Sequence, residues 1–264
     1  MFDRYADPNE RLALILCAVF SAFAYLLVCA TIIGIPYLAL GAMFFAIVEG
    51  CVLGALRGNG VKVTPSQFPA VHRFATDIAR QMNFPALPDI VVVQEGGLLN
   101  AFATRFFGRN FVVIYSDILE LAIDQGEAEV AFVVAHEMAH LYRKHTIWKA
   151  FLYPAMLVPF AGVAYSRCCE YTADAIATAI VPDGAVNGLL VLAAGKQLYR
   201  HVDPGTFAAQ AGEAHRSFWI TVAELLSTHP ILPKRLVRVG EALSRNSARV
   251  RSLTDAAANV PAVR

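Results

Sequence analysis

Residues 134–141 contain two histidines and a glutamate whose types and spacing can bind a metal ion. His136 and His140 are four residues apart, and Glu137 directly follows the first of them. On an α-helix, residues i and i+4 lie on one face, about 6 Å apart along the axis. Both imidazoles can therefore reach one small cation, and the glutamate can reach a water beside it. This His-Glu-x-x-His pattern predicts a zinc site with its own base.

A catalytic zinc site takes three protein ligands and keeps one position open, so a third ligand must lie elsewhere. Glu170 and Asp174 are again four residues apart and would point the same way on a helix. We expect Glu170 to complete a site for one zinc ion per chain. We expect Asp174 to accept the N–H of a ligand histidine, because such outer carboxylates fix its tautomer. By analogy with other enzymes that pair these motifs, that histidine is His136.

Taken together, these motifs resemble the HtpX-like membrane zinc metalloproteases, which are relatives of the CAAX prenyl proteases. The resemblance covers about residues 60–245 and, in general form, an N-terminal membrane hairpin. Four segments in the family's order carry it: Asn100-Ala101-Phe102-Ala103, His136-Glu137-x-x-His140, Ser166-Arg167-x-x-Glu170-x-x-x-Asp174, and His229-Pro230 followed by Arg235. It implies an α+β fold that is mostly helical, a zincin-like domain with a small β-sheet.

The resemblance also implies roles for individual residues. Glu137 would act as general base on a water that zinc activates. His229 would donate a hydrogen bond to the oxyanion of the tetrahedral intermediate, and Arg235 would brace the site. The strand that would pair with an extended substrate, as an added β-strand, comprises Asn100, Ala101, Phe102 and Ala103.

The composition predicts that part of the chain does not face water. Of its 264 residues, 57% are hydrophobic and 16% are charged, with a mean hydropathy of +0.51. The apolar run over 12–56 is long enough for two crossings of roughly 20 residues each. Gly34-Ile35-Pro36-Tyr37 is the natural break, which gives helices near 12–33 and 37–56. A cleaved signal peptide fits less well, because the start is not basic and a second apolar segment follows at once.

The charges beside this hairpin predict its orientation. Arg4 and Arg11 precede it, and Arg57 and Lys62 follow it, so both ends should be cytoplasmic by the positive-inside rule. We therefore expect an integral protein, most naturally of a bacterial inner membrane, whose catalytic domain faces the cytoplasm. Its partners would be the lipid bilayer and a peptide or membrane-protein substrate. A net charge of +1 without a basic run indicates no nucleic-acid partner. The sequence leaves the oligomeric state open.

The sequence also predicts how the chain divides. We expect a hairpin over 1–58, a metalloprotease domain over 59–245 and a mobile tail over 246–264. Within the domain we expect strands at 89–94, 98–107 and 111–115, and helices near 65–82, 127–145, 167–180, 184–201, 205–227 and 232–244. The apolar stretch 150–165 should not span the membrane. One crossing would separate His140 from Glu170, and sixteen residues cannot make two.

Several residues have two readings. Glu49 lies within the second span, either as a functional acid or as a carboxyl that reaches the interface. His229 could instead cap the helix at Pro230, and Asn100 could be a turn residue. The adjacent Cys168 and Cys169 are expected to be packing residues, although vicinal thiols can bind a soft metal. His145 is expected to be solvated, because the polar residues 142–144 precede it.

These observations favour a membrane-anchored zinc endopeptidase, with membrane-protein quality control as one role compatible with the site. The alternative is a catalytically silent membrane scaffold or regulator with a structural zinc site. Glu137 favours the enzyme, because a structural site needs no base. An intramembrane protease is not favoured, because His136 lies some eighty residues beyond the hairpin.

Overall fold

The computed structural model describes residues 2–94, 101–106, 108–123, 126–158, 160–214 and 216–258. The described chain is mostly helical, with one small sheet, as the sequence predicts. The elements in order are η1 (Asp3–Tyr5), α1 (Glu10–Cys29), α2 (Gly34–Asn59), β1 (Val61–Lys62), α3 (Pro69–Gln81), β2 (Asp89–Val93), β3 (Ala101–Phe106), β4 (Arg109–Tyr115), α4 (Ser116–Ile123), α5 (Glu127–Tyr142), α6 (His145–Phe151), α7 (Tyr153–Met156), α8 (Ala161–Ile180), α9 (Pro182–Leu198), η2 (Tyr199–His201), α10 (Pro204–Ala214), α11 (Phe218–Leu226) and α12 (Leu232–Ala258).

The four strands form one mixed sheet in the order β1-β2-β4-β3. Strand β2 pairs in parallel with β4, and β3 pairs antiparallel with β4, with Phe106 opposite Arg109 and a turn at Gly108. Gly108 takes a φ of 80° in that turn, a conformation that glycine adopts without a side-chain clash. Among the described strands β3 therefore lies at an edge, as the substrate-strand prediction requires.

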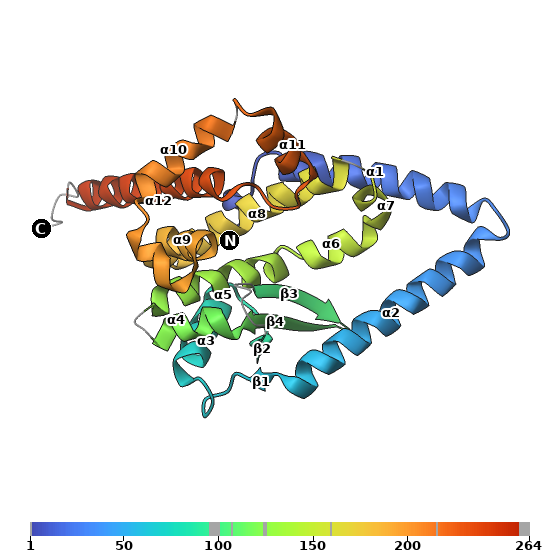
Figure 1. Ribbon diagram of the computed structural model, residues 1–264, viewed down its shortest axis with the longest axis horizontal. Helices are drawn as coiled ribbons and strands as arrows, with labels where there is room; N and C mark the ends of the chain where they lie inside the picture. The colour runs from blue at the N-terminus through green and yellow to red at the C-terminus, as the bar shows by residue number, and fades with distance from the viewer. Residues whose placement is uncertain are drawn as a thin grey trace, which may run out of the picture.

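Helix α5 is the centre of the fold. Every residue from Glu129 to Leu141 is buried, because the sheet lies on one side and α8 and α9 lie on another. A helix that is apolar on all faces in its middle is expected to be enclosed in this way. Figure 1 shows α5 between the strands below it and α8, α9 and α12 above it. Residues 129–141 of α5 are thus enclosed between the sheet and the helices α8 and α9.

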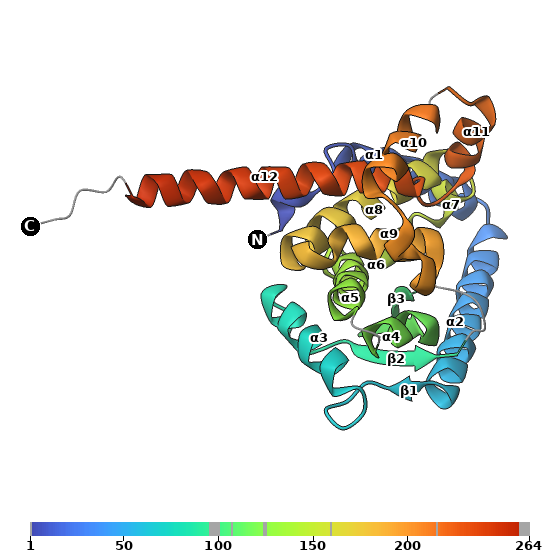
Figure 2. The ribbon, with the colours of Figure 1, turned by 60° about the vertical axis from the view of Figure 1, so that its left-hand side comes forward.

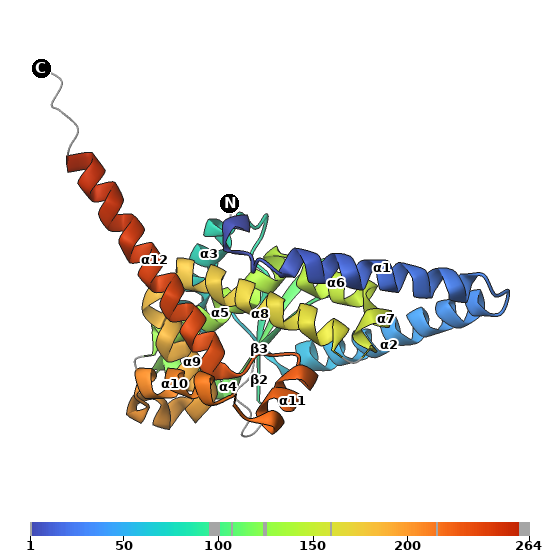
Figure 3. The same ribbon diagram turned by 90° about the horizontal axis from the view of Figure 1, so that it is seen from above.

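Helices α1 and α2 project from this body as a V. They meet at the turn near residues 30–33 and diverge towards their other ends, so that α1 packs on α7 and α8 while α2 reaches β2 (Figures 1 and 3). Within the described ranges, α1 and α2 are the two helices that are long and apolar enough to cross a membrane.

The stretch 150–165 forms no span-length helix. It contains the end of α6, the single turn α7 and the start of α8. Leu152, Ala155 and Tyr165 are buried against Cys17 of α1, whereas Phe151 and Leu157 are exposed. Among the described residues, neither helix that is long and apolar enough to cross a membrane lies in this stretch, and its place relative to the membrane stays a prediction.

Several element boundaries differ from those expected. The helix predicted from residue 65 begins at Pro69, because Thr64 instead closes a turn by accepting the N–H of Gln67 at 3.0 Å. The helix predicted over 205–227 is divided into α10 and α11, and α8 begins six residues earlier than expected. The last helix continues to Ala258 rather than ending near 244, and Figure 2 shows it extending beyond the other elements.

Candidate metal centre and active site

The two motifs predicted to bind metal meet between α5 and α8. Nε2 of His136 and Nε2 of His140 are 3.2 Å apart, and each lies 3.4 Å from an oxygen of Glu170. Bonds of about 2.0–2.1 Å to one tetrahedral zinc place its ligand atoms about 3.3 Å from one another. The three side chains are all buried, and together they could hold a metal ion. Their identity, separation and burial fit zinc.

Behind the first histidine, Asp174 lies where the sequence predicts an orienting carboxylate. Its Oδ1 is 2.9 Å from Nδ1 of His136, on the side of the ring away from Nε2. Arg235 donates from Nε and Nη2 to both Asp174 oxygens at 2.7 Å. Its Nη1 is also 3.5 Å from Glu170. Arg235 therefore contacts two of the acids at the site, and its bracing role stays a prediction.

The three ligand side chains differ in their protonation when no metal is bound. Burial alone would lower the pKa of His136, but its bonds to Asp174 and Glu170 raise that pKa to about 10. Burial lowers the pKa of His140 to about 3. Burial would raise the pKa of Glu170, but the neighbouring histidines and Arg235 hold it well below its usual value. Without a proton, the three ligand atoms would all present lone pairs to one another and repel. The proton on His136 reduces this repulsion.

The second histidine has a different outer partner, His145, and the prediction that His145 is solvated is wrong. His145 is not solvated but only 1% exposed, and its Nδ1 lies 2.9 Å from Nδ1 of His140. Lys144 causes this, because it adopts a left-handed conformation with a φ of 59° and interrupts the helix between Tyr142 and His145. The ring of His145 consequently turns back towards α5. Its Nε2 lies 3.4 Å from Glu10 at the start of α1.

Glu137 faces strand β3 beside the three candidate ligands. Burial raises the pKa of its carboxyl to about 7, and the backbone N–H of Ala103 in β3 bonds to it. Two cavities of about 290 and 200 Å³ adjoin this carboxylate, and both are lined by Ala101, His136, Glu137, Glu170 and His229. A base with a pKa near neutrality beside a sheet edge is suited to proton transfer on a bound chain.

The remaining predicted residues lie around these cavities. Phe102 and Ala103 line the smaller one together with Ala101. His229 has a side chain that is 62% exposed, and its Nε2 is 3.6 Å from Glu170. It does not begin a helix, because α12 starts at Leu232. Asn100 lies outside the described residues.

Glu49 and the paired cysteines also have defined surroundings. Glu49 accepts a hydrogen bond of 3.3 Å from Thr104 of β3, so α2 is tied to the edge strand at this point. Cys168 and Cys169 are free thiols on α8, and burial raises their pKa values to about 11 and 12. Such thiols stay protonated near neutral pH, which favours packing over metal binding.

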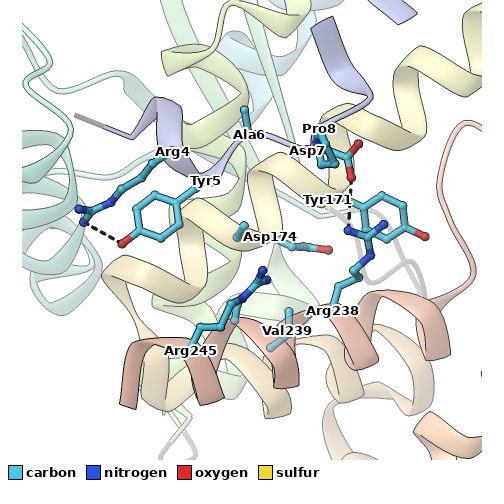
Figure 4. Close-up of a pocket in the computed structure, with 12 residues that line it drawn as sticks. Arg4, Tyr5, Ala6, Asp7, Pro8, Tyr171, Asp174, Arg238, Val239 and Arg245 are labelled. Atoms are coloured by element: carbon cyan, nitrogen blue, oxygen red, sulfur yellow. Dashed lines mark hydrogen bonds and ion pairs between the residues drawn. The ribbon is translucent and has the colours of Figure 1, made fainter. Parts of the chain in front are cut away.

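A further cavity of about 280 Å³ lies on the far side of Asp174, between the N-terminal segment, α8 and α12. Figure 4 shows Arg4, Arg238 and Arg245 around it, with Asp7 paired to Arg238 at 3.5 Å. It contains none of the three ligand residues, so the chemistry described above belongs to the other two cavities.

A helix with His-Glu-x-x-His, a glutamate from a second helix and an edge strand beside them define the metallopeptidase class. The model of peptidase family M48 matches residues 65–163 and 148–243, which together include most of the chain. The chain belongs to peptidase family M48. It is also 28% identical over 156 residues to the plastoglobule-localized metallopeptidase 48 of the Arabidopsis thaliana chloroplast. That match covers 52% of this chain and 44% of the relative, so the chain spans less than half of that protein. No solved structure matches this chain.

Proposed function

We propose that this chain is a membrane-anchored zinc endopeptidase in which His136, His140 and Glu170 bind one zinc ion and Glu137 is the general base. The observation that carries the proposal is the position of Glu137, buried between the three ligand atoms and the edge of β3. A structural metal site has no need for an ionisable group there. The catalytically silent scaffold is therefore the weaker alternative.

The residues of the site divide the work of hydrolysis. Bound zinc would polarise the scissile carbonyl and lower the pKa of the attacking water. Glu137 takes a proton from that water and passes it to the leaving amine. His229 is exposed enough to reach a bound substrate, and it donates a hydrogen bond to the oxyanion. Asp174, itself held by Arg235, keeps His136 in one orientation.

Strand β3 supplies the substrate site in this proposal. Its only described strand partner is β4, and Ala101, Phe102 and Ala103 border the cavity that contains Glu137. An extended peptide that pairs with the edge near Asn100–Ala103 would pass its carbonyl groups close to this carboxylate. Main-chain pairing of this kind selects an extended conformation and accepts varied side chains.

Helices α1 and α2 anchor the enzyme in a membrane. In the most apolar 18-residue segments of α1 and α2, only 11% and 6% of the residues are buried. The rest of the described chain therefore leaves these side chains uncovered. A core helix would be mostly buried, and a lipid bilayer is the natural solvent for such surfaces. The basic residues at both ends of this hairpin support a catalytic domain on the cytoplasmic side by the positive-inside rule, and a bacterial inner membrane is the location that we propose. Unfolded membrane proteins would be substrates within reach.

Zinc dependence is the test of this function. The purified full-length chain in detergent should hydrolyse casein, lose this activity on dialysis against a chelator and regain it with one equivalent of Zn²⁺. Hydrolysis that survives complete removal of zinc would contradict the proposal. Glu137→Gln expressed in membranes should retain uncleaved substrates for identification by mass spectrometry. The control is a double variant that carries both Glu137→Gln and His136→Ala. If Glu137→Gln retains no more protein than this control does, substrates are not captured at this site.

A further inference from the structure

A chain of buried side chains runs from the second histidine of the metal site to the start of α1. Nδ1 of His140 lies 2.9 Å from Nδ1 of His145, and Nε2 of His145 lies 3.4 Å from Oε1 of Glu10. The residues are 8%, 1% and 4% exposed, so water does not compete for these contacts. The path crosses three helices, because His140 is on α5, His145 begins α6 and Glu10 begins α1.

The direction of the hydrogen bonds in this path follows from the metal site. Nε2 of His140 faces His136 and Glu170, and a neutral imidazole that binds metal through Nε2 carries its hydrogen on Nδ1. His140 must then donate to His145, whose Nδ1 accepts. The hydrogen of His145 is consequently on Nε2, where the acceptor within reach is the carboxylate of Glu10. Each group in the path is satisfied in this arrangement.

Glu10 is itself held in place by other donors. Arg143 donates to its Oε1 at 2.9 Å, and the hydroxyl of Thr172 on α8 donates to Oε2. The backbone N–H of Asp7 bonds to the same hydroxyl group at 2.8 Å. The carboxylate of Asp7 pairs with Arg238, as Figure 4 shows. The segment before the first apolar helix is therefore docked on α5, α8 and α12, behind the metal site.

The two histidines thus have equivalent support from different parts of the chain. His136 is backed by Asp174, which is held by Arg235. His140 is backed by His145, which is backed by Glu10 and, through it, Arg143. Outer partners fix the orientation of a metal-bound imidazole and raise its basicity. The first support lies wholly within the catalytic domain, whereas the second ends on the helix proposed to enter the membrane.

We propose that His145 and Glu10 are positioning residues for His140, so that docking of the N-terminal end of α1 completes the zinc site. This inference rests on the proposed zinc function. It makes the anchor part of the metal centre, because zinc affinity depends on a carboxylate at the point where the anchor begins. Movement of α1 away from α5 would remove the acceptor for His145 and loosen His140.

Zinc affinity of the purified full-length chain tests the inference, measured by competition with a chelating dye. Loss of an outer partner typically weakens metal binding by about 10–100-fold. His145→Ala should lie in that range, and Glu10→Gln should weaken binding about tenfold, because the amide is a weaker acceptor than the carboxylate. Asp77→Asn is the matched control. Asp77 is an exposed acid on α3 that pairs with Arg80, and none of the contacts described here joins that pair to His140, so zinc affinity should be unchanged.

A double-variant cycle separates positioning from general stability. If Glu10 acts through His145, Glu10→Gln should have no further effect on zinc affinity in a chain that already carries His145→Ala. Additive losses, or a Glu10→Gln chain that binds zinc as tightly as the parent, would overturn the inference. Glu10→Asp, which keeps the charge but withdraws it from His145, replaces Glu10→Gln if that chain does not fold. A parent chain that binds no zinc would instead overturn the proposed function, and this inference with it.

Discussion

Arg235 and Asp174 form a buried ion pair in which two N–H groups meet two carboxylate oxygens at 2.7 Å. The pair joins α12 to α8 and turns Oδ1 of Asp174 towards Nδ1 of His136. The C-terminal His-Pro…Arg segment therefore reaches the metal centre from behind, and His229 reaches it from the cavity side. One stretch of chain therefore supplies both a buried guanidinium and an exposed imidazole next to Glu170.

Removing the guanidinium should strongly destabilise the protein. Arg235→Met leaves the Asp174 carboxylate buried without its main partner, and breaking a buried pair in this way costs about 3–5 kcal/mol. The exposed pair between Lys62 and Asp89 gives a matched control, since Lys62→Met should cost less than about 1 kcal/mol. Denaturant unfolding of the two variants measures both costs. Equal losses of unfolding free energy would contradict the bracing role of Arg235.

The third ligand can be tested by metal content. Glu170→Ala removes one of three converging ligand atoms and leaves two histidines, so the purified chain should contain almost no zinc by elemental analysis. Glu127→Ala changes an exposed glutamate at the start of α5 and should retain one zinc per chain. Full zinc occupancy in Glu170→Ala would show that the third ligand is another residue.

Zinc binding should strengthen as the pH rises. The pKa of His136 is raised to about 10 in the metal-free site, that of His140 is lowered to about 3, and that of Glu170 is well below its usual value. Near neutral pH His136 is therefore the ligand that must lose a proton. The affinity should rise about tenfold per pH unit between pH 6.5 and 8.5 and level off above about pH 10. Chelator competition across this range measures it, and a flat profile would contradict the protonated His136.

Helix α9 approaches α5 so closely that a single methyl group should not fit. A Cβ at Gly184 would lie 1.9 Å from the carbonyl oxygen of Ala128. Gly184→Ala should therefore destabilise the chain by about 1–3 kcal/mol, since one helix must shift. Gly212 in α10 has open space around it, so Gly212→Ala should instead stabilise the chain by about 0.4–1 kcal/mol. Thermal unfolding distinguishes the two, and similar melting temperatures would contradict this packing.

The part of the site that follows from local spacing was predictable from the sequence. His136, His140, Glu170 and Asp174 are paired at i and i+4, and helix geometry brings each pair to one face. The buried α5 and the strands β2 and β4 were predicted from runs of apolar and β-branched residues. These features depend on neighbours a few residues away, which a sequence displays directly.

The outer support of His140 was not predictable in this way. Glu10 precedes His145 by 135 residues, and no local pattern relates the two. The polar residues before His145 indicated a solvated helix end. The structure differs because Lys144 adopts a left-handed conformation and interrupts the helix between α5 and α6. A long-range contact beside an unexpected turn leaves no signal in residue spacing.

The central claim is that Glu137 is the base of a zinc peptidase, and one side-by-side assay tests it most directly. Casein hydrolysis by the purified parent and by Glu137→Gln is measured on samples whose zinc content is determined in parallel. We expect one zinc per chain in both proteins and hydrolysis by the parent alone, because the amide keeps the shape of the site but cannot accept the proton. A zinc-loaded Glu137→Gln chain that cleaves casein as fast as the parent would show that Glu137 is not the base.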